Sequence, residues 1–299
     1  MITHKFRLYP SKENIEKLDG ALELHRQAYN ILLGELNSQK EIDQSQIQAT
    51  LPDMKICDSR FEKVHSKALQ YECYRLFSNL SSLAKLKKKG KRVGSLRFKG
   101  KGWFKTFTYN QSGFKLKPTG KRLQTLWLSK IGSIPIRCHR NIKGKIKQIT
   151  VKKEPSGRWF ASICEERKVI IPKQPIKNVV GIDLGTIDLI YDSDGNSITN
   201  PRHLNKKADK LAYLQRRMSK KKLRSNNRNR WRTRLARQYE KLTNTRNDFL
   251  HKLSRAYVSN FDAIGVEDMD ITRMVHGNLS KSILDAGWGQ LRQYMAYKA

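Results

Sequence analysis

The sequence predicts a mixed α and β protein in two parts. A small barrel of short strands carrying inserted helices comes first, and a second sheet interrupted by a basic helical segment follows. Apolar residues recur at helical spacing in parts of 11–90, at alternate positions through 95–170, and in two separate runs near 179–192 and 261–267. With 299 residues, the chain is long enough for two domains.

The N-terminal part begins with a strand at residues 2–10, which places Ile2, Phe6 and Leu8 on one side. Pro10 and Ser11 then start a helix. Its apolar positions follow at three- and four-residue steps or their multiples: Ile15, Leu18, Leu22, Tyr29, Leu32 and Leu36. Residues 37–60 are polar and are predicted to be loop. A second helix at about 61–88 is predicted to bury Phe61, Val64, Ala68, Tyr71 and Leu76.

Short strands at regular spacing follow, which is typical of a small barrel. They are "KTFTY", "GFKLK", "RLQTLWL", "IPIR", "GKIKQITV" and "RWFASICEE", with "EPSGR" (154–158) as a hairpin turn. Lys143, Lys145 and Lys147 alternate with Ile142 and Ile146, which gives the sheet a basic face. Such a face is either solvated or contacts phosphates, and the charge of the chain favours phosphates. Residues 170–178 are predicted to be a linker.

The second part opens with strand, turn and strand in "VVGIDLGTIDLIYDSDGNSIT" (179–199). Residues 202–255 are helical and contain 19 Lys or Arg against three acids, so the segment carries +16. Two antiparallel helices joined near "SKKKLRSNNRNR" fit the apolar pattern, with Trp231 as a packing residue. A buried strand at 261–267 follows, and a helix at 282–299, in which Trp288 is predicted to be a packing residue, completes the chain.

The net charge indicates a polyanionic partner, because 61 Lys and Arg face 26 Asp and Glu, a formal charge of +35. Nucleic acid is the leading candidate, and a membrane surface is the weaker one. The N-terminus does not resemble a signal peptide, so we expect a cytosolic protein. One run without any acid is either a solvated helix end or a phosphate-binding surface: Lys220, Lys221, Lys222, Arg224, Arg228, Arg230, Arg232, Arg234 and Arg237.

The spacing of the four cysteines argues against a zinc site within this chain, because they are far apart and form no CxxC pair. They are Cys57, Cys73, Cys138 and Cys164. We expect them to be reduced and structural.

Asp183 follows an apolar run in "GIDLGT", and three interpretations compete for it. The first is a turn residue before glycine. The second is the first phosphate loop of an actin-like or sugar-kinase ATPase, but "GNLS" (277–280) and "GWGQ" (287–290) are poor candidates for the further loops that this fold needs. The third is a metal-dependent nuclease of the ribonuclease H-like fold, whose carboxylates come from separate strands. Glu267, 84 residues later at the end of the second apolar strand, is then the natural partner.

Taken over the whole chain, the sequence resembles the TnpB/OrfB-type proteins of bacterial insertion sequences, which are relatives of the compact type V CRISPR nucleases. The resemblance rests on "KFRLYPSKEN", "IGSIPIRCHRNIKGKIKQITVKKEPSGRWFASI", "VVGIDLGT", "KLAYLQRRMSKKKLRSNNR", "DFLHKLSRAYVSNFDAIGVEDMDI" and "SILDAGWGQLRQYMAYKA". These segments together are far more specific than the short "DLG" motif.

This resemblance implies a wedge-type β-barrel at 1–175 with a helical recognition insertion at about 11–90. It implies a RuvC-like nuclease domain at 176–299 with a basic helical hairpin at about 202–258. Asp183 and Glu267 match two catalytic carboxylates that bind Mg²⁺ or Mn²⁺. The partners would be a guide RNA from the transposon end and target double-stranded DNA. The protein would be a monomer or weak dimer in the prokaryotic cytoplasm, associated with the nucleoid.

The family pattern continues beyond this sequence with a strand, a zinc ribbon and a third catalytic Asp. Asp285 does not match that third carboxylate, so we expect an incomplete RuvC-like site without the zinc ribbon. Cleavage is therefore in doubt, and the alternatives are an RNA-guided DNA-binding protein that does not cleave or an inactive transposon remnant.

Individual nucleic-acid contacts are open at this stage. Lys67 and Gln70 could reach base edges or could be ordinary helix-surface residues. The aromatic residues of the 103–109 segment could stack on bases or belong to the barrel core: Trp103, Phe104, Phe107 and Tyr109. His251 is expected to be structural.

Overall fold

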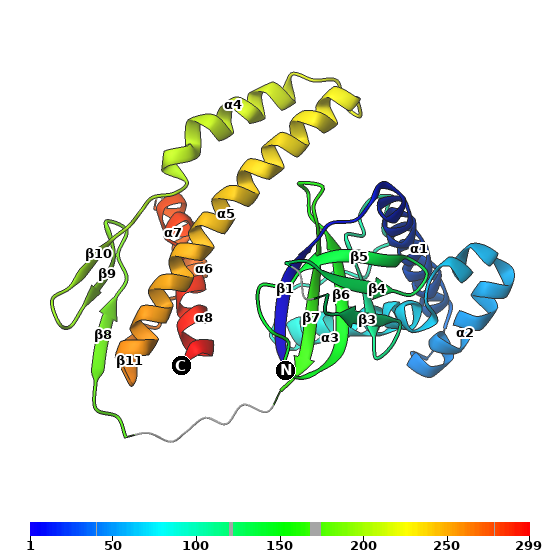
Figure 1. Ribbon diagram of the computed structural model, residues 1–299, viewed down its shortest axis with the longest axis horizontal. Coiled ribbons are helices and arrows are strands. Elements are labelled where there is room, and N and C mark those ends of the chain that lie inside the picture. Colours follow the sequence, from blue (N-terminus) through cyan, green and yellow to red (C-terminus); the bar gives the residue numbers. More distant parts are fainter. Residues whose placement is uncertain (40, 120–121, 168–174, 278) are drawn as a thin grey trace. The chain divides into compact units, whose positions relative to one another are not determined.

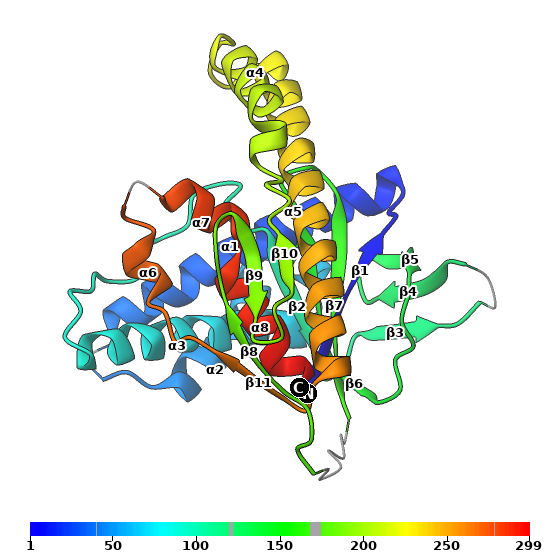
Figure 2. The same ribbon diagram turned by 90° about the vertical axis from the view of Figure 1, so that its left-hand side faces the viewer.

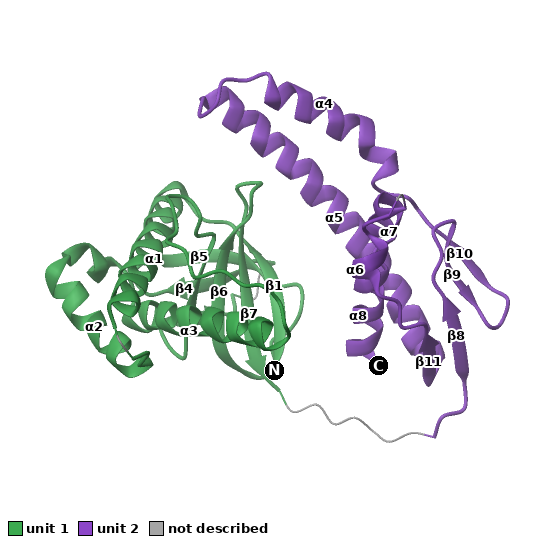
Figure 3. Cartoon of the chain, turned by 180° about the vertical axis from the view of Figure 1, so that it is seen from behind, with its two compact units in different colours: residues 1–169 green, residues 170–299 purple. Residues whose placement is uncertain are grey.

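A computed structural model describes residues 1–39, 41–119, 122–167, 175–277 and 279–299. The chain divides into two compact units, Met1–Val169 and Ile170–Ala299 (Figure 3). The boundary proposed at 175–176 falls a few residues later than this division. Most of the linker predicted at 170–178 lies outside the described residues, and its last residues, 175–178, have no helix or strand.

The first unit contains a seven-stranded antiparallel sheet that curls into a nearly closed barrel (Figure 1). Its order is β2-β6-β7-β1-β5-β4-β3. The strands are β1 Ile2–Leu8, β2 Thr106–Asn110, β3 Phe114–Lys117, β4 Gln124–Leu128, β5 Gly132–Arg137, β6 Lys145–Lys153 and β7 Trp159–Glu166. All of the predicted strands are present. Strand β6 turns into β7 at the predicted "EPSGR", where the Glu154 amide donates to the Arg158 carbonyl and Gly157 has a φ of +82°.

Helices cover the core of this barrel. The predicted first helix is α1 (Lys12–Ser38), and the Ser11 hydroxyl caps it by accepting from the Asn14 amide. Its apolar stripe is buried, including Leu18, Leu22 and Leu32. Helix α3 (Ser66–Lys88) begins later than the predicted residue 61, because a 3₁₀ turn, η1 (Ser59–Lys63), precedes it. The predicted inward residues Phe61 and Val64 are nonetheless buried.

The prediction of a loop over 37–60 was wrong, because α2 (Gln44–Cys57) occupies most of it. Asp43 caps this helix by accepting from the Ser45 amide. Only Ile47 and Met54 are buried from it, at a spacing of two turns, and Pro52 lies inside it. The sequence of α2 is polar and contains a proline, so the helix depends for its stability on the tertiary contacts of these two residues.

The second unit contains a four-stranded sheet in the order β10-β9-β8-β11. The strands are β8 Val179–Asp183, β9 Asp188–Asp192, β10 Ser197–Thr199 and β11 Ala263–Val266. Strands β8 and β11 run parallel, and the other pairs are antiparallel. The strand predicted to be buried at 261–267 is present as β11, but it lies at the edge and its apolar side chains are only half-buried.

Helices cover one face of this sheet. Helix α5 (Asn226–Asn260) packs its C-terminal half there with α7 (Ser280–Ala286) and α8 (Trp288–Lys298), and a short α6 (Ile271–Met274) follows β11. The single helix predicted over 282–299 is broken at Gly287, which has a φ of +71° and lies between α7 and α8.

The basic segment forms the predicted helical hairpin. The short 3₁₀ turn η2 (Asn205–Lys207) leads into helix α4 (Ala208–Ser219), which packs against the N-terminal half of α5. This pair extends beyond the sheet of its own unit (Figures 1 and 2). The apolar stripe between the helices is Leu211, Leu214, Leu235 and Leu242, with Trp231 packed against it. None of the described helices is long and apolar enough to cross a membrane.

Candidate acidic site and basic surfaces

Asp183 and Glu267 come to the same edge of the second sheet. Strands β8 and β11 are parallel neighbours, and Ile182 lies opposite Val266 in their register. Asp183 directly follows Ile182, and Glu267 directly follows Val266. Adjacent strands of a sheet lie about 4.8 Å apart. Ile182 and Val266 pack into the core, so the alternation of a strand turns the two carboxylates toward the other face. Both side chains are exposed.

The other acids beside Glu267 are already engaged. The Arg292 guanidinium donates to Asp268 at 2.7 Å. Asp270 caps α6 by accepting from the Arg273 amide. No hydrogen bond or ion pair joins the Asp183 or Glu267 carboxylate to another described residue. Of the three acids in "VEDMD", Glu267 is the one whose side chain makes no hydrogen bond or ion pair with another described residue.

The turn after Asp183 is held by a residue from the C-terminal helix. The Trp288 indole Nε1 donates to the Gly185 carbonyl at 3.2 Å, and the Trp288 side chain is buried. A Cβ at Gly185 would collide with the Asp188 carbonyl oxygen, so the turn requires glycine. The sequence predicted Trp288 only as a packing residue, because nothing in the pattern indicated what its N–H would bind.

Asp192 supports the same site from inside. Its carboxylate accepts from the Tyr257 hydroxyl at 3.0 Å and from the Asn196 amide at 2.8 Å. Burial works to raise the pKa of Asp192, but these hydrogen bonds outweigh burial and hold the pKa below its ordinary value. Burial and the Asp192 carboxylate raise the pKa of Tyr257 to about 12. Asp192 is thus a structural acid that the sequence analysis did not single out.

The carboxylates fit a hard divalent cation by their chemistry. A shallow hollow of about 390 Å³ beside Asp183 is lined by Gly181, Tyr191, Asp192, Ser193 and Gly195, on the β9 side of Asp183, and Glu267 is not part of this lining. Oxygen ligands in an open, solvated position suit Mg²⁺, which retains several waters when it binds to proteins. Within the described ranges, no group of three or more His, Cys, Asp and Glu gathers in a metal-binding arrangement.

The basic hairpin presents most of its cations to solvent. The exposed members of the predicted run are Lys220, Lys222, Arg224, Arg230, Arg232, Arg234 and Arg237, and Lys221 is half-buried. Arg228 differs from them, because its Nη1 donates to the Met218 and Lys221 carbonyls and so caps the end of α4. The Arg234 guanidinium lies 4.8 Å from the Trp231 ring, so Trp231 both packs the hairpin and orients a cation.

The three predicted barrel lysines are not equivalent. Lys143 and Lys145 are exposed, whereas Lys147 pairs with Glu166 at 2.8 Å. A β-bulge between Ile146 and Gln148 interrupts the expected alternation at Lys147. The segment is held by buried Glu165, which accepts from the Lys143 amide at 2.7 Å and also from the Gly144 amide.

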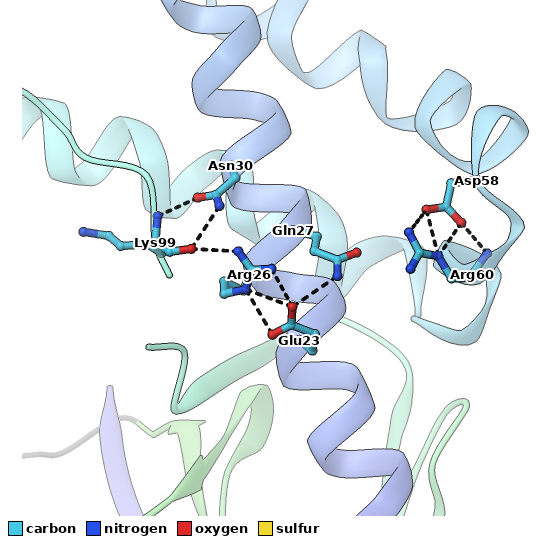
Figure 4. A network of polar contacts seen from close by, with 7 residues as sticks. All are labelled: Glu23, Arg26, Gln27, Asn30, Asp58, Arg60 and Lys99. Atoms are coloured by element: carbon cyan, nitrogen blue, oxygen red, sulfur yellow. Dashed lines mark hydrogen bonds and ion pairs between the residues drawn. The ribbon is translucent and has the colours of Figure 1, made fainter. Parts of the chain in front are cut away.

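The remaining predicted contacts divide between surface and core. Lys67 is exposed and Gln70 half-buried on α3. Phe107 and Tyr109 are buried and Phe104 packs against the core, whereas Trp103 is 72% exposed. Figure 4 shows Arg26 and Asn30 of α1 binding the backbone of Lys99, which fixes the segment leading to Trp103.

His251, Asp285 and the cysteines have structural surroundings. The His251 ring stacks on Tyr294 at 3.8 Å. Both Asp285 oxygens accept from the Leu204 amide at 2.9 Å, which ties α7 to the start of the basic segment. The cysteines are free; Cys73 and Cys164 are buried, and burial raises the pKa of Cys73 to about 11.

Comparison with known proteins gives a consistent family. Residues 149–277 match the OrfB_IS605 family model, described as "Probable transposase". The chain is 33% identical over 224 residues to the Escherichia coli (strain K12) protein "Putative RNA-guided DNA endonuclease InsQ", a match that covers 70% of this chain and 54% of that protein. It is 29% identical over 312 residues to a Streptomyces pristinaespiralis "Putative RNA-guided DNA endonuclease", covering 98% and 73% respectively. The chain thus spans about half the length of the first relative.

The fold agrees with these sequence matches. A cryo-EM structure of a Cas12f1–sgRNA–target DNA complex aligns with a TM-score of 0.55 at 13% identity, over 94% of this chain and 70% of that one. At this identity the match concerns the fold alone. The family model and the sequence relatives together identify the chain as a member of the OrfB_IS605 family, the TnpB/OrfB-type proteins of insertion sequences.

Proposed function

We propose that the chain acts as an RNA-guided, Mg²⁺-dependent DNA endonuclease of the TnpB type. The observation that carries this proposal is the placement of Asp183 and Glu267 at the ends of two adjacent parallel strands. A turn residue would need no such partner. A phosphate loop that binds ATP would not explain why a second exposed acid, Glu267, lies next to Asp183 at the end of the neighbouring strand.

Asp183 and Glu267 are the residues that would hold the divalent cation, Mg²⁺ or Mn²⁺. Such an ion lowers the pKa of a bound water and stabilises the leaving oxygen of a phosphodiester. The chain contributes two exposed carboxylates in fixed register and a turn pinned by Trp288. Because the hollow beside Asp183 is shallow and open, a nucleic-acid strand can approach it.

The exposed cations of the α4–α5 hairpin, together with Lys143, Lys145 and Lys67, would bind the phosphates of a guide RNA and target double-stranded DNA. On α3, Gln70 would contact nucleic acid together with Lys67, and Trp103 would offer a stacking platform. We propose that the protein does this as a monomer or weak dimer associated with the prokaryotic nucleoid.

A second function, guided DNA binding without cleavage, has its own support. The exposed cations lie on elements other than those that carry the two carboxylates. Binding and cleavage are therefore separable, and binding does not require a complete metal site.

The test is Mg²⁺-dependent cutting of a plasmid target by the 299-residue chain with its guide RNA. Asp183→Ala and Glu267→Gln should abolish cutting without weakening binding, while Asp53→Asn, at an exposed position on α2, serves as the matched control and should change neither. Guided cutting that persists in Asp183→Ala contradicts the endonuclease. Tight guided binding without cutting by the unaltered chain supports the second function.

A further inference from the structure

Two arginines lie directly opposite each other on the outer surface of the barrel. Arg7 of β1 pairs in register with Arg137 of β5. Their neighbours Leu8 and Ile136 are buried in the core, so the alternation of each strand directs both arginines outward. Opposed residues of an antiparallel pair have Cβ atoms about 5 Å apart, and like charges in this position are destabilising.

Nothing among the described residues compensates this pair. No carboxylate forms an ion pair with Arg7 or Arg137, and the Arg7 Nε is buried without a hydrogen-bond partner. The next outward cation on β1 behaves differently, because Lys5 pairs with Glu154 at 2.8 Å. Of the two outward-facing cations of β1, Lys5 thus has a carboxylate partner and Arg7 has none among the described residues. An anion held between the two guanidinium groups would offer this donor an acceptor and would also offset the repulsion between the two charges.

The surroundings of the pair also fit an anion. The Arg7 guanidinium lies 4.8 Å from the Tyr9 ring, which limits its orientations. Arg140, three residues after Arg137, is also exposed. Partial burial lowers the pKa of His139 most, and the charge of Arg140 lowers it further; a hydrogen bond with the Arg137 backbone opposes this, and the Arg137 charge adds a smaller lowering. The charges that act on His139 are thus those of neighbouring basic residues.

The geometry points to a phosphate clamp in which Arg7 and Arg137 together hold one phosphodiester of a bound nucleic acid. Guanidinium groups bind phosphate oxygens in a bidentate manner, and a single phosphate between two of them removes their repulsion. This site rests on the proposed nucleic-acid function, but it lies outside the acidic site and the predicted basic runs. The phosphodiester could come from the guide RNA or from DNA, and the test separates these sources.

A shared phosphate predicts a particular pattern in salt titrations. Each neutralised phosphate contributes about 0.9 to the slope of log affinity against log salt for duplex DNA and about 0.7 for single strands. Arg7→Gln and Arg137→Gln should each lower the slope by that amount for one of the two nucleic acids or for both, and the double variant should lower it no further. For duplex DNA, the affinity loss between about 50 mM and about 200 mM salt then shrinks about threefold.

The experiment uses fluorescent single-stranded RNA and duplex DNA with the full chain. The matched control removes two exposed charges from the last turn of α3, Lys87→Gln and Lys88→Gln, where no opposed pair exists. A change with RNA assigns the clamp to RNA, and a change with DNA assigns it to DNA. If the slope of the Arg7→Gln, Arg137→Gln double variant equals the slope of this control, the clamp is overturned. If the double variant lowers the slope by the sum of the two single changes, the two arginines do not share one phosphate.

Inorganic pyrophosphate provides a measurement that does not depend on nucleic-acid binding. It should raise the melting temperature of the unaltered chain and of the α3 control, and this rise should be lost in the Arg7→Gln, Arg137→Gln double variant. If the unaltered chain binds neither nucleic acid, the proposed function fails. The pyrophosphate result then decides the clamp by itself, because an equal rise in all three proteins overturns it.

Discussion

At the scale of single residues, the candidate site depends on which polar groups are engaged and which are free. Asp268 and Asp270 are bound by Arg292 and by the α6 N-terminus, whereas Glu267 and Asp183 have no partner among the described residues. The sequence could place acids at the end of a strand, because apolar runs mark strands. It could not distinguish structural acids from available ones, since that depends on partners distant in sequence.

Glu165 shows how one buried carboxylate orders a basic segment. The hydrogen bond from the Gly144 amide lowers the pKa of Glu165, burial opposes this, and hydrogen bonds from His4 and the Lys143 amide lower it further. A carboxylate with a depressed folded-state pKa stabilises the protein above its unfolded pKa of about 4.3. This contribution is lost as the pH falls through the folded-state pKa.

Glu165→Gln should therefore lower the free energy of unfolding near neutral pH by about 1–3 kcal/mol, because two backbone amides lose a charged acceptor. Chemical denaturation between neutral and acidic pH would measure this. The difference from the unaltered chain should shrink as the pH falls below about 4. A difference that is constant over this range would contradict the role of the charge.

Trp288→Phe should retain most of the packing and remove the hydrogen bond to Gly185. We expect a loss of about 1 kcal/mol in the free energy of unfolding, and weaker Mn²⁺ binding because the turn after Asp183 is less restrained. Trp127→Phe, at a half-exposed position in the barrel, is the control and should change neither quantity appreciably. Mn²⁺ affinity that is unchanged in Trp288→Phe would limit the indole to packing.

At the scale of elements, periodicity predicted most helices and strands correctly and failed where few residues are buried. Helix α2 was missed because it buries only two side chains and contains Pro52. The C-terminal helix was predicted as continuous because Gly287 interrupts no apolar pattern. Its left-handed conformation is a backbone property that periodicity does not report.

Gly287→Ala should destabilise the second unit for two reasons. A non-glycine residue at φ +71° costs about 1–2 kcal/mol, and the new Cβ would lie 3.1 Å from Leu250 Cδ1. Gly90 has the same φ of +71° with nothing within 4 Å of a Cβ, so Gly90→Ala measures the backbone contribution alone. Thermal unfolding should show the larger loss in Gly287→Ala. Equal losses would mean that the contact with Leu250 relaxes without cost.

At the scale of the whole molecule, the sequence predicted two parts, a barrel-like sheet and the strands that carry Asp183 and Glu267. Composition indicated a nucleic-acid partner without knowledge of the fold, because the net charge of +35 is a sum over all residues of the chain. The parallel pairing of β8 with β11 could not be derived from periodicity, since it joins strands separated by the whole basic hairpin. Nor could the opposition of Arg7 and Arg137, which depends on strand register.

The central claim is that Asp183 and Glu267 form one divalent-cation site, and Mn²⁺ titration followed by electron paramagnetic resonance tests it most directly. Asp183→Ala and Glu267→Ala should each weaken binding by about tenfold or more, and the double variant should bind no more weakly than either single variant. This non-additivity is expected of two residues that hold the same ion. Mn²⁺ affinity in either single variant equal to that of the unaltered chain would contradict the claim.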